Sequence, residues 1–181
     1  MSIITGVLDT ETTGLDPVDH RIIEVCIVLF RDRKPIGGVN QRIYPDRPID
    51  PRAEMVHGIS LRDLEGKPRF AEAAPKIFKA LDRCDNLVAH NLSFDMGFFA
   101  AEFARLKYDL SGWVKKKGFC TLEEGRWATP TGKVPNLKEL CFATGVQYDA
   151  DRAHSALYDT VVLAKALFRG VDLGFFDLKV A

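Results

Sequence analysis

The stretch IIEVCIVLF at residues 22–30 constrains the fold most, because it is apolar on both sides of an extended segment apart from Glu24. Such a run is typical of a central strand in a sheet that is covered by helices on both faces. IITGVLD before it and VNQRIYP after it are also predicted strands, with a hairpin-like turn at RDRKPIGG. We therefore expect the chain to begin with a three-stranded meander.

Helices and short strands alternate in the rest of the chain. The apolar periodicity predicts helices at FAEAAPKIFKALDR and FDMGFFAAEFARL, and strands at NLVAH and at the end of WVKKKGFC. Three further helices are predicted at LEEGRWA, NLKELCFATG and SALYDTVVLAKALF. Gly145 is the expected end of the penultimate helix, and Ser155 is the expected N-cap of the last one. This order indicates an α/β fold, with a five-stranded mixed sheet flanked by helices, in a single domain over residues 1–181.

The composition is that of a globular protein, with 46% hydrophobic and 28% charged residues. Lysine plus arginine equals aspartate plus glutamate, so a general polybasic mode of nucleic-acid binding is not indicated. The four cysteines form no CxxC pair, which disfavours zinc and favours a reducing, cytoplasmic compartment. The start of the chain lacks the basic region of a signal peptide, and VCIVLF is too short to span a bilayer, so we expect no membrane association.

Four acids and one histidine stand beside apolar runs that would otherwise be plain core: Asp9, Glu11, Asp95, His154 and Asp159. Asp9 and Glu11 are two residues apart at the end of the first predicted strand, so their side chains emerge on the same face. Asp159 lies on a largely apolar helix, where a carboxylate needs a cationic partner. If the four acids converge, hard divalent cations relieve their repulsion, and a pair does so best. The set therefore predicts a metal-dependent nuclease.

Each of these residues also has a simpler interpretation. Asp9 and Glu11 could cap a turn, and Asp95 could stabilise the N-terminus of its helix through the helix dipole. His154 is five residues before Asp159 and so belongs in the loop before the helix, where it could be a capping or surface group. The prediction therefore depends on the five residues as a set. Glu24, inside the second strand, is expected to be a hydrogen-bonded structural acid and not a metal ligand.

Three motifs carry a resemblance to a known family. The motifs are DTETTG, HNLSFD and HSALYD, and they resemble the three exonuclease motifs of the DEDD superfamily in their order and approximate distances. The spacing H-x4-D in the third motif resembles the DEDDh branch of that superfamily. Three further stretches agree with this resemblance: HRIIEV, VHGIS and NLKELC. The resemblance runs from about Ile3 to Phe168. It is strongest to the epsilon, or proofreading, subunits of bacterial DNA polymerase III.

The resemblance implies a ribonuclease-H-like fold and a 3′→5′ exonuclease that releases nucleoside 5′-monophosphates. By the family pattern, Asp9 bridges two Mg²⁺ or Mn²⁺ ions, Glu11 and Asp159 complete one ion site, and Asp95 supports the other. His154 takes a proton from the attacking water, a role that suits an imidazole because its usual pKa of about 6.5 is near working pH.

The resemblance also implies a cradle for the 3′-terminal nucleotide. Its parts are the backbone around Thr12, Thr13 and Gly14, the side chain of Leu15, and His57, and Asn91 contacts the scissile strand. The implied partner is a nucleic acid 3′ end, with single-stranded DNA favoured over RNA. A polymerase or other replication or repair protein is a candidate partner, although the stretch after the last helix is shorter than the C-terminal segment that tethers epsilon subunits.

Two alternatives stay open at the level of sequence. The same site would serve an exoribonuclease that trims RNA 3′ ends, similar to ribonuclease T. A non-catalytic nucleic-acid-binding module with the same fold is the other alternative, and the presence of all five residues argues against it.

Overall fold

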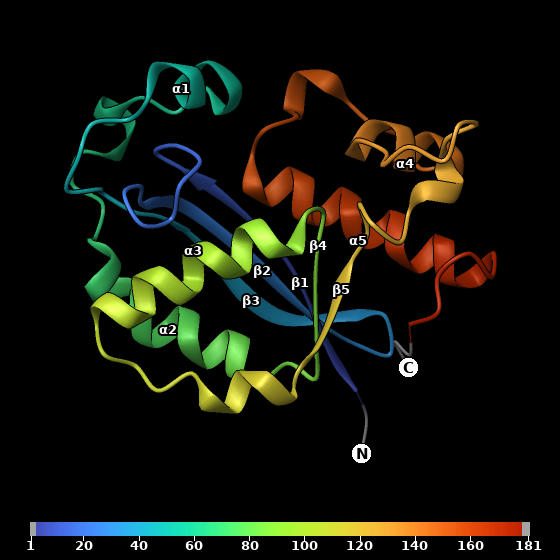
Figure 1. Cartoon of the computed structure of the whole chain (residues 1–181), viewed down its shortest axis with the longest axis horizontal. Helices are drawn as coiled ribbons and strands as arrows, with labels where there is room; N and C mark the ends of the chain where they lie inside the picture. The colour runs from blue at the N-terminus through green and yellow to red at the C-terminus, as the bar shows by residue number, and fades with distance from the viewer. Residues whose placement is uncertain (1–2, 179–181) are drawn as a thin grey trace.

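The computed structural model describes residues 3–178, so the two ends of the predicted domain lie outside the described residues. At its centre is a five-stranded sheet with the strand order β3-β2-β1-β4-β5 (Figure 1). The strands are β1 (Ile4–Thr12), β2 (Ile22–Arg31), β3 (Lys34–Arg42), β4 (Asn86–Ala89) and β5 (Lys117–Cys120). The first three are antiparallel, whereas β4 pairs in parallel with both β1 and β5. The predicted mixed five-stranded sheet is thus confirmed.

Helices cover both faces of the sheet. The α-helices are α1 (Pro51–His57), α2 (Phe70–Asp82), α3 (Leu92–Arg105), α4 (Leu137–Thr144) and α5 (Ala156–Asp172), with short 3₁₀ turns at Leu61–Leu64, Ser111–Lys115, Arg126–Ala128 and Ala150–Arg152. The core cluster that contains Leu8 includes α2 and α3, and the cluster that contains its neighbour Val7 includes α4 and α5. Successive residues of β1 therefore point into opposite cores, as the two-sided apolar pattern predicted.

Three elements differ from the sequence prediction. The prediction of a helix at LEEGRWA is wrong, since the segment forms turns that end in a 3₁₀ turn at Arg126–Ala128. The hairpin between β2 and β3 turns at Asp32 and Arg33, both with positive φ, so β3 includes most of the segment expected to be a turn. A two-residue turn of this kind matches the twist of the flanking strands. The last helix runs four residues past Phe168, to Asp172, and Phe176 packs against this extension at Gly170, where a Cβ atom would lie 2.4 Å from the ring.

No helix within residues 3–178 is long and apolar enough to cross a membrane.

Candidate active site

The topology of the sheet brings the predicted acids together at the C-terminal ends of two neighbouring strands. β1 and β4 are parallel and end on the same side of the sheet, the usual position of functional sites in open α/β sheets. Asp9 and Glu11 lie near the end of β1, and Asp95 lies in the first turn of α3, directly after β4. Asp159 lies in the first turn of α5, which packs against β1 and β2. Three segments that are far apart in sequence thus supply the four carboxylates.

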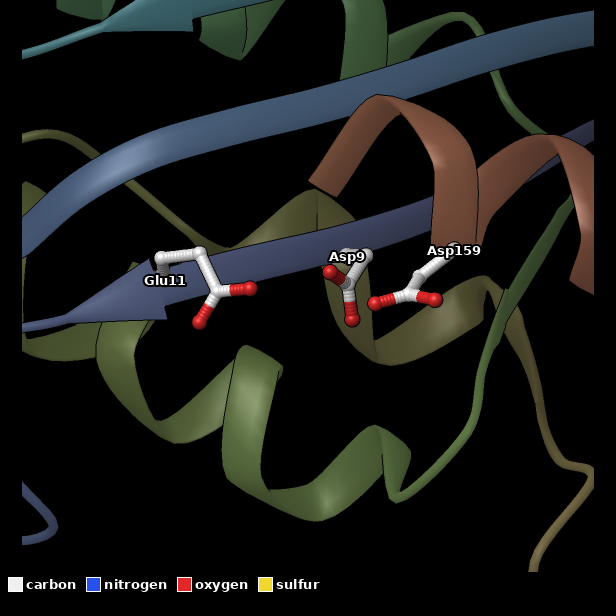
Figure 2. Close-up of side chains that lie close together, drawn as sticks. All are labelled: Asp9, Glu11 and Asp159. Carbon is white, nitrogen blue, oxygen red and sulfur yellow. The ribbon is translucent and has the colours of Figure 1, made fainter. Parts of the chain in front are cut away.

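Three of the four acids form a compact cluster. Asp9, Glu11 and Asp159 each offer a carboxylate oxygen, and these oxygens lie within 4.8 Å of one another. Figure 2 shows the carboxylate of Asp159 extending from α5 toward that of Asp9 on β1, with Glu11 further along the strand. None of the ion pairs formed among residues 3–178 includes one of these three. The Oδ1 atom of Asp159 is buried and accepts no hydrogen bond from the described residues. This oxygen-only donor set fits a hard divalent cation.

The crowding of acids raises their pKa values. Burial raises the pKa of Asp9 well above its usual value, and the charges of Asp95, Glu11 and Asp159 add to the effect. Burial, with the charge of Asp159, raises the pKa of Glu11 to about 8. Burial also raises the pKa of Asp159, although the backbone N–H of His154 opposes it. Without a cation, the fold therefore favours the protonated forms of these three carboxyl groups.

Asp95 lies beside the cluster, with a partner that the sequence analysis missed. It is only 3% exposed, and its Oδ1 atom accepts a hydrogen bond of 2.8 Å from the hydroxyl of Thr10. Burial raises the pKa of Asp95 to about 7, and the Thr10 hydroxyl opposes this shift. Its charge in turn raises the pKa of Asp9, which is the neighbour of Thr10 in β1. The sequence signal that could have indicated this partner is the position of Thr10, a polar residue between Asp9 and Glu11 in a buried strand.

Glu24 has the structural role that the sequence predicted. It faces Glu11 across the β1–β2 ladder and is 6% exposed. Its Oε1 atom accepts a hydrogen bond from Arg42, and its Oε2 atom accepts one from the backbone N–H of Ala156, the first residue of α5. Glu24 thus fixes the start of the helix that carries Asp159.

His154 lies in the loop before α5, as its spacing predicted. It is exposed, and its φ of 61° is in the left-handed region. Its backbone N–H donates a hydrogen bond of 2.9 Å to Oδ2 of Asp159. The loop that carries the imidazole is therefore anchored on one of the clustered carboxylates.

The predicted cradle residues surround the end of β1, and several hold its shape through internal bonds. The hydroxyl of Thr12 donates to the carbonyl of Gly14, and the hydroxyl of Thr13 accepts from the backbone N–H of Arg21. His57 is buried at the end of α1, and its Nδ1 atom accepts from the N–H of Ile59, so its Nε2 atom donates to the carbonyl of Thr12. Burial lowers the pKa of His57, which keeps this imidazole neutral.

Of the other three cradle residues, two are exposed and one is buried. Leu15 is 82% exposed, and Asn91 is exposed at the N-cap of α3 with a left-handed backbone. Gly14 is required by packing, since a Cβ atom there would lie 2.2 Å from the His20 ring. The binding roles of all six residues stay predictions.

Fold and site together define a nuclease of the ribonuclease-H-like exonuclease type that uses divalent metal ions. The chain belongs to the exonuclease family, whose model matches residues 7–167. It is 37% identical over 184 residues to DNA polymerase III subunit epsilon of Haemophilus influenzae, and 38% identical over 170 residues to that of Escherichia coli. These alignments cover 94% and 88% of this chain and 69% and 68% of the relatives. The predicted enzyme class, a 3′→5′ exonuclease, is confirmed.

Solved structures agree in fold. A complex of E. coli exonuclease I with single-stranded DNA superposes with a TM-score of 0.82 at 19% identity and covers 96% of this chain, which spans 41% of that chain. Exonuclease X in complex with 5′ overhanging duplex DNA superposes with a TM-score of 0.71 at 24% identity, covering 97% of this chain and 96% of that chain. At these identities the comparison establishes the fold.

Proposed function

We propose that this exonuclease removes nucleotides from the 3′ ends of DNA strands in the manner of proofreading and releases nucleoside 5′-monophosphates. The observation that carries the proposal is the cluster of Asp9, Glu11 and Asp159, whose oxygens lie within 4.8 Å of one another near the C-terminal end of β1. The names of the relatives, epsilon subunits of a DNA polymerase, support DNA over RNA.

In this proposal Asp9, Glu11 and Asp159 hold divalent ions, with Mg²⁺ or Mn²⁺ as the candidates, and Asp95 supports a second ion from beside Asp9. When bound, such ions neutralise the charge that develops on the phosphate during hydrolysis. The Oδ1 atom of Asp159 supports this assignment, because it has no partner within residues 3–178, whereas a buried carboxylate oxygen usually has a hydrogen-bond partner.

The remaining chemistry belongs to the chain and to water. A water molecule attacks the phosphorus of the terminal phosphodiester, and the imidazole of His154 accepts its proton. The bond between phosphorus and the O3′ atom of the preceding nucleotide breaks, and that oxygen takes up a proton from solvent. The anchoring of the His154 loop on Asp159 supports this role, because it keeps the base next to the clustered acids.

The terminal nucleotide is received by the loop after β1. Leu15 contacts the base or sugar with its exposed apolar side chain, while the backbone of Thr12, Thr13 and Gly14 and the His57 region form the wall behind it. Asn91 contacts the scissile strand from the start of α3. The hydrogen bonds within this loop support the proposal, because they define its backbone before a nucleotide binds.

A digestion experiment tests the proposal. The purified chain is incubated with 5′-labelled single-stranded, duplex and mismatched DNA and with a matched RNA, with Mg²⁺, Mn²⁺ or a chelator. We expect stepwise shortening of DNA from the 3′ end that depends on metal and is absent in Asp9→Ala. Faster degradation of RNA would point to the RNA-trimming alternative, and no release of nucleotide with either metal would point to a non-catalytic module.

A polymerase is the proposed protein partner, on the strength of the relatives' names. Co-elution of the chain with the DNA polymerase III polymerase subunit of the same source, during gel filtration at micromolar concentration, would support it. Separate elution of the two at that concentration would contradict it.

A further inference from the structure

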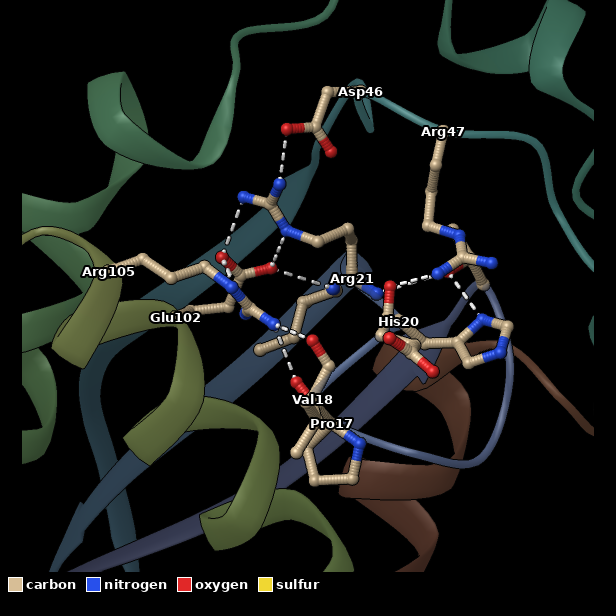
Figure 3. Close-up of polar contacts among 11 residues, drawn as sticks. Pro17, Val18, His20, Arg21, Asp46, Arg47, Glu102 and Arg105 are labelled. Carbon is tan, nitrogen blue, oxygen red and sulfur yellow. Dashed lines mark hydrogen bonds and ion pairs between the residues drawn. The ribbon is translucent and has the colours of Figure 1, made fainter.

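The loop between β1 and β2, residues 13–21, is held from outside by the C-terminal half of α3 (Figure 3). Arg105, in the last turn of α3, donates hydrogen bonds from Nη2 to two carbonyl oxygens of this loop, at 2.7 Å to Pro17 and 2.8 Å to Val18. A guanidinium suits this task, because the two N–H donors on Nη2 can each bind one carbonyl group while Nη1 faces Glu102. Arg105 therefore holds the tip of the loop at two consecutive residues.

Glu102 connects that contact to the far end of the loop. Its carboxylate is 1% exposed and accepts hydrogen bonds of 2.8 Å from both Nε and Nη2 of Arg21. It also accepts one of 3.2 Å from the backbone N–H of Ile22, and Nη1 of Arg105 lies 3.5 Å away. Arg21 in turn pairs with Asp46. A single buried acid thus joins the end of the loop to the residue that holds its tip.

The loop depends on these polar contacts because apolar packing does not hold its tip. Leu15 is 82% exposed and Val18 is 77% exposed, so the larger apolar side chains there point to solvent. The other constraints are local hydrogen bonds, such as those from the backbone N–H groups of Val18 and His20 to Asp16, and two contacts from the segment after β3. In these, Arg47 donates to the carbonyl of Asp19 and the backbone N–H of Asp50 donates to the carbonyl of Thr13. They hold the loop on either side of its tip, whereas Arg105 holds Pro17 and Val18 themselves.

The same helix carries an acid of the active site. Asp95 and Glu102 are seven residues apart on α3 and are both buried, so they share one face of the helix. One end of α3 therefore holds the carboxylate of Asp95 against Thr10, the neighbour of Asp9, while the other end holds the loop that carries Gly14 and Leu15. Because one helix carries Asp95 and also holds the loop, α3 fixes the distance between the acidic site and the cradle.

We propose that Arg105 and Glu102 are positioning residues that hold the 13–21 loop in the shape that receives the 3′-terminal nucleotide. The inference rests on the proposed function, since it concerns the cradle of that same site. It assigns to the C-terminal half of α3 a role in substrate affinity and none in metal binding or in the chemical step.

The test compares three variants with the wild-type chain. Arg105→Gln removes the charge and shortens the side chain, so that its amide does not reach both loop carbonyl groups. Arg105→Lys keeps the charge but replaces the two Nη atoms, which bind the loop and face Glu102 separately, by one ammonium nitrogen. Arg169→Gln is the matched control, because Arg169 is exposed in the last turn of α5 and makes no ion pair with the described residues. For each protein we measure kcat and KM on a single-stranded DNA oligonucleotide, and the Kd of thymidine 5′-monophosphate by calorimetry with Mn²⁺ present. We also measure hydrogen exchange of residues 13–20 and the rise in Tm with Mn²⁺.

We expect Arg105→Gln to raise KM and the mononucleotide Kd by a similar factor, on the order of ten-fold, as loss of charge-assisted hydrogen bonds commonly does. Exchange of the 13–20 amides should accelerate, while kcat and the Mn²⁺-dependent rise in Tm stay near those of the wild type. Arg105→Lys should recover in part, because one ammonium group can donate to the loop carbonyl groups but cannot also face Glu102 through a second nitrogen. A KM and a Kd within two-fold of the wild type in Arg105→Gln would overturn the inference.

The outcome separates this inference from the proposed function. A wild-type chain that neither digests DNA nor binds the mononucleotide with Mn²⁺ present contradicts the proposed function itself. A wild-type chain that does both, with Arg105 variants that match it, contradicts only the positioning role.

Discussion

At the scale of single residues, Asp159 connects two parts of the site. Its Oδ2 atom accepts the backbone N–H of His154, while its Oδ1 atom is buried without a partner among the described residues. One carboxylate therefore contributes to the acidic cluster and also fixes the loop that carries the imidazole. The two functions can be separated by substitution, because one depends on charge and the other on a hydrogen-bond acceptor.

His154→Ala should slow hydrolysis by about 10²- to 10⁴-fold at neutral pH, because that is the usual contribution of a positioned general base. The backbone N–H that bonds to Asp159 is kept, so the rise in Tm with Mn²⁺ should be unchanged. Steady-state kinetics on single-stranded DNA and a melting curve measure the two effects. Recovery of rate with added imidazole supports the assignment, and a near-normal rate at neutral pH contradicts it.

Asp159→Asn should make the metal-free protein more stable at pH 8 and should abolish most of the stabilisation by Mn²⁺. The amide keeps an oxygen for the His154 N–H but removes a charge that raises the pKa of both Glu11 and Asp9. Melting curves in chelator and in saturating Mn²⁺ measure the change. A variant that is stabilised by the metal as much as the wild type would show that Asp159 is not a ligand.

At the scale of elements, a buried ion cluster joins α3 to the start of β2. Glu102→Ala should lower the free energy of unfolding by about 3 kcal/mol, because it leaves Arg21 and the N–H of Ile22 without their common acceptor. Asp172→Ala is the control, since its ion pair with Arg33 is exposed and should contribute less than about 1 kcal/mol. Urea unfolding of both variants gives the comparison. Equal losses would show that the burial of Glu102 does not matter.

The helix ends show which features local sequence can predict. Gly145 was predicted as the end of α4 from residue type alone, and it is there, with a φ of 73° that glycine adopts without strain. Ser155 is the N-cap residue of α5, as predicted, but its hydroxyl makes no cap hydrogen bond with the described residues. Glu24 accepts the N–H of Ala156 instead, across 132 residues of sequence. Local rules cannot anticipate a partner that only the folded sheet brings close.

In the active site, too, local sequence predicts some features, whereas others depend on contacts that form only in the folded chain. The two-residue spacing of Asp9 and Glu11 predicted their common face, and the structure confirms that they lie together with Asp159. The bond from Thr10 to Asp95 and the contacts of Arg105 with the loop join residues that are 85 or more positions apart. No periodicity or motif in the sequence specifies such pairs, because they depend on how α3 lies against β1 and β2.

At the scale of the whole molecule, the acidic site makes folding depend on pH and on metal ions. Burial raises the pKa of Glu11 from 4.5 to about 8 and that of Asp95 from 3.8 to about 7. Between the usual values and the raised ones, the folded metal-free chain binds more protons than the unfolded chain does. Its stability therefore falls as pH rises from about 4 to about 8, by about 1.4 kcal/mol for each unit of pKa shift that is realised.

Divalent ions should reverse this dependence, because they bind the deprotonated carboxylates of the folded state. We expect Mn²⁺ or Mg²⁺ to raise Tm strongly at pH 8 and little near pH 5, where protons compete for the same oxygens. Melting curves across this range, in chelator and in saturating metal, measure both slopes, and Asp9→Ala should flatten both. A Tm that rises with pH in chelator between about pH 5 and 8, or an increment from the metal that does not change with pH, would contradict the idea that one cluster of acids couples metal binding to the stability of the fold.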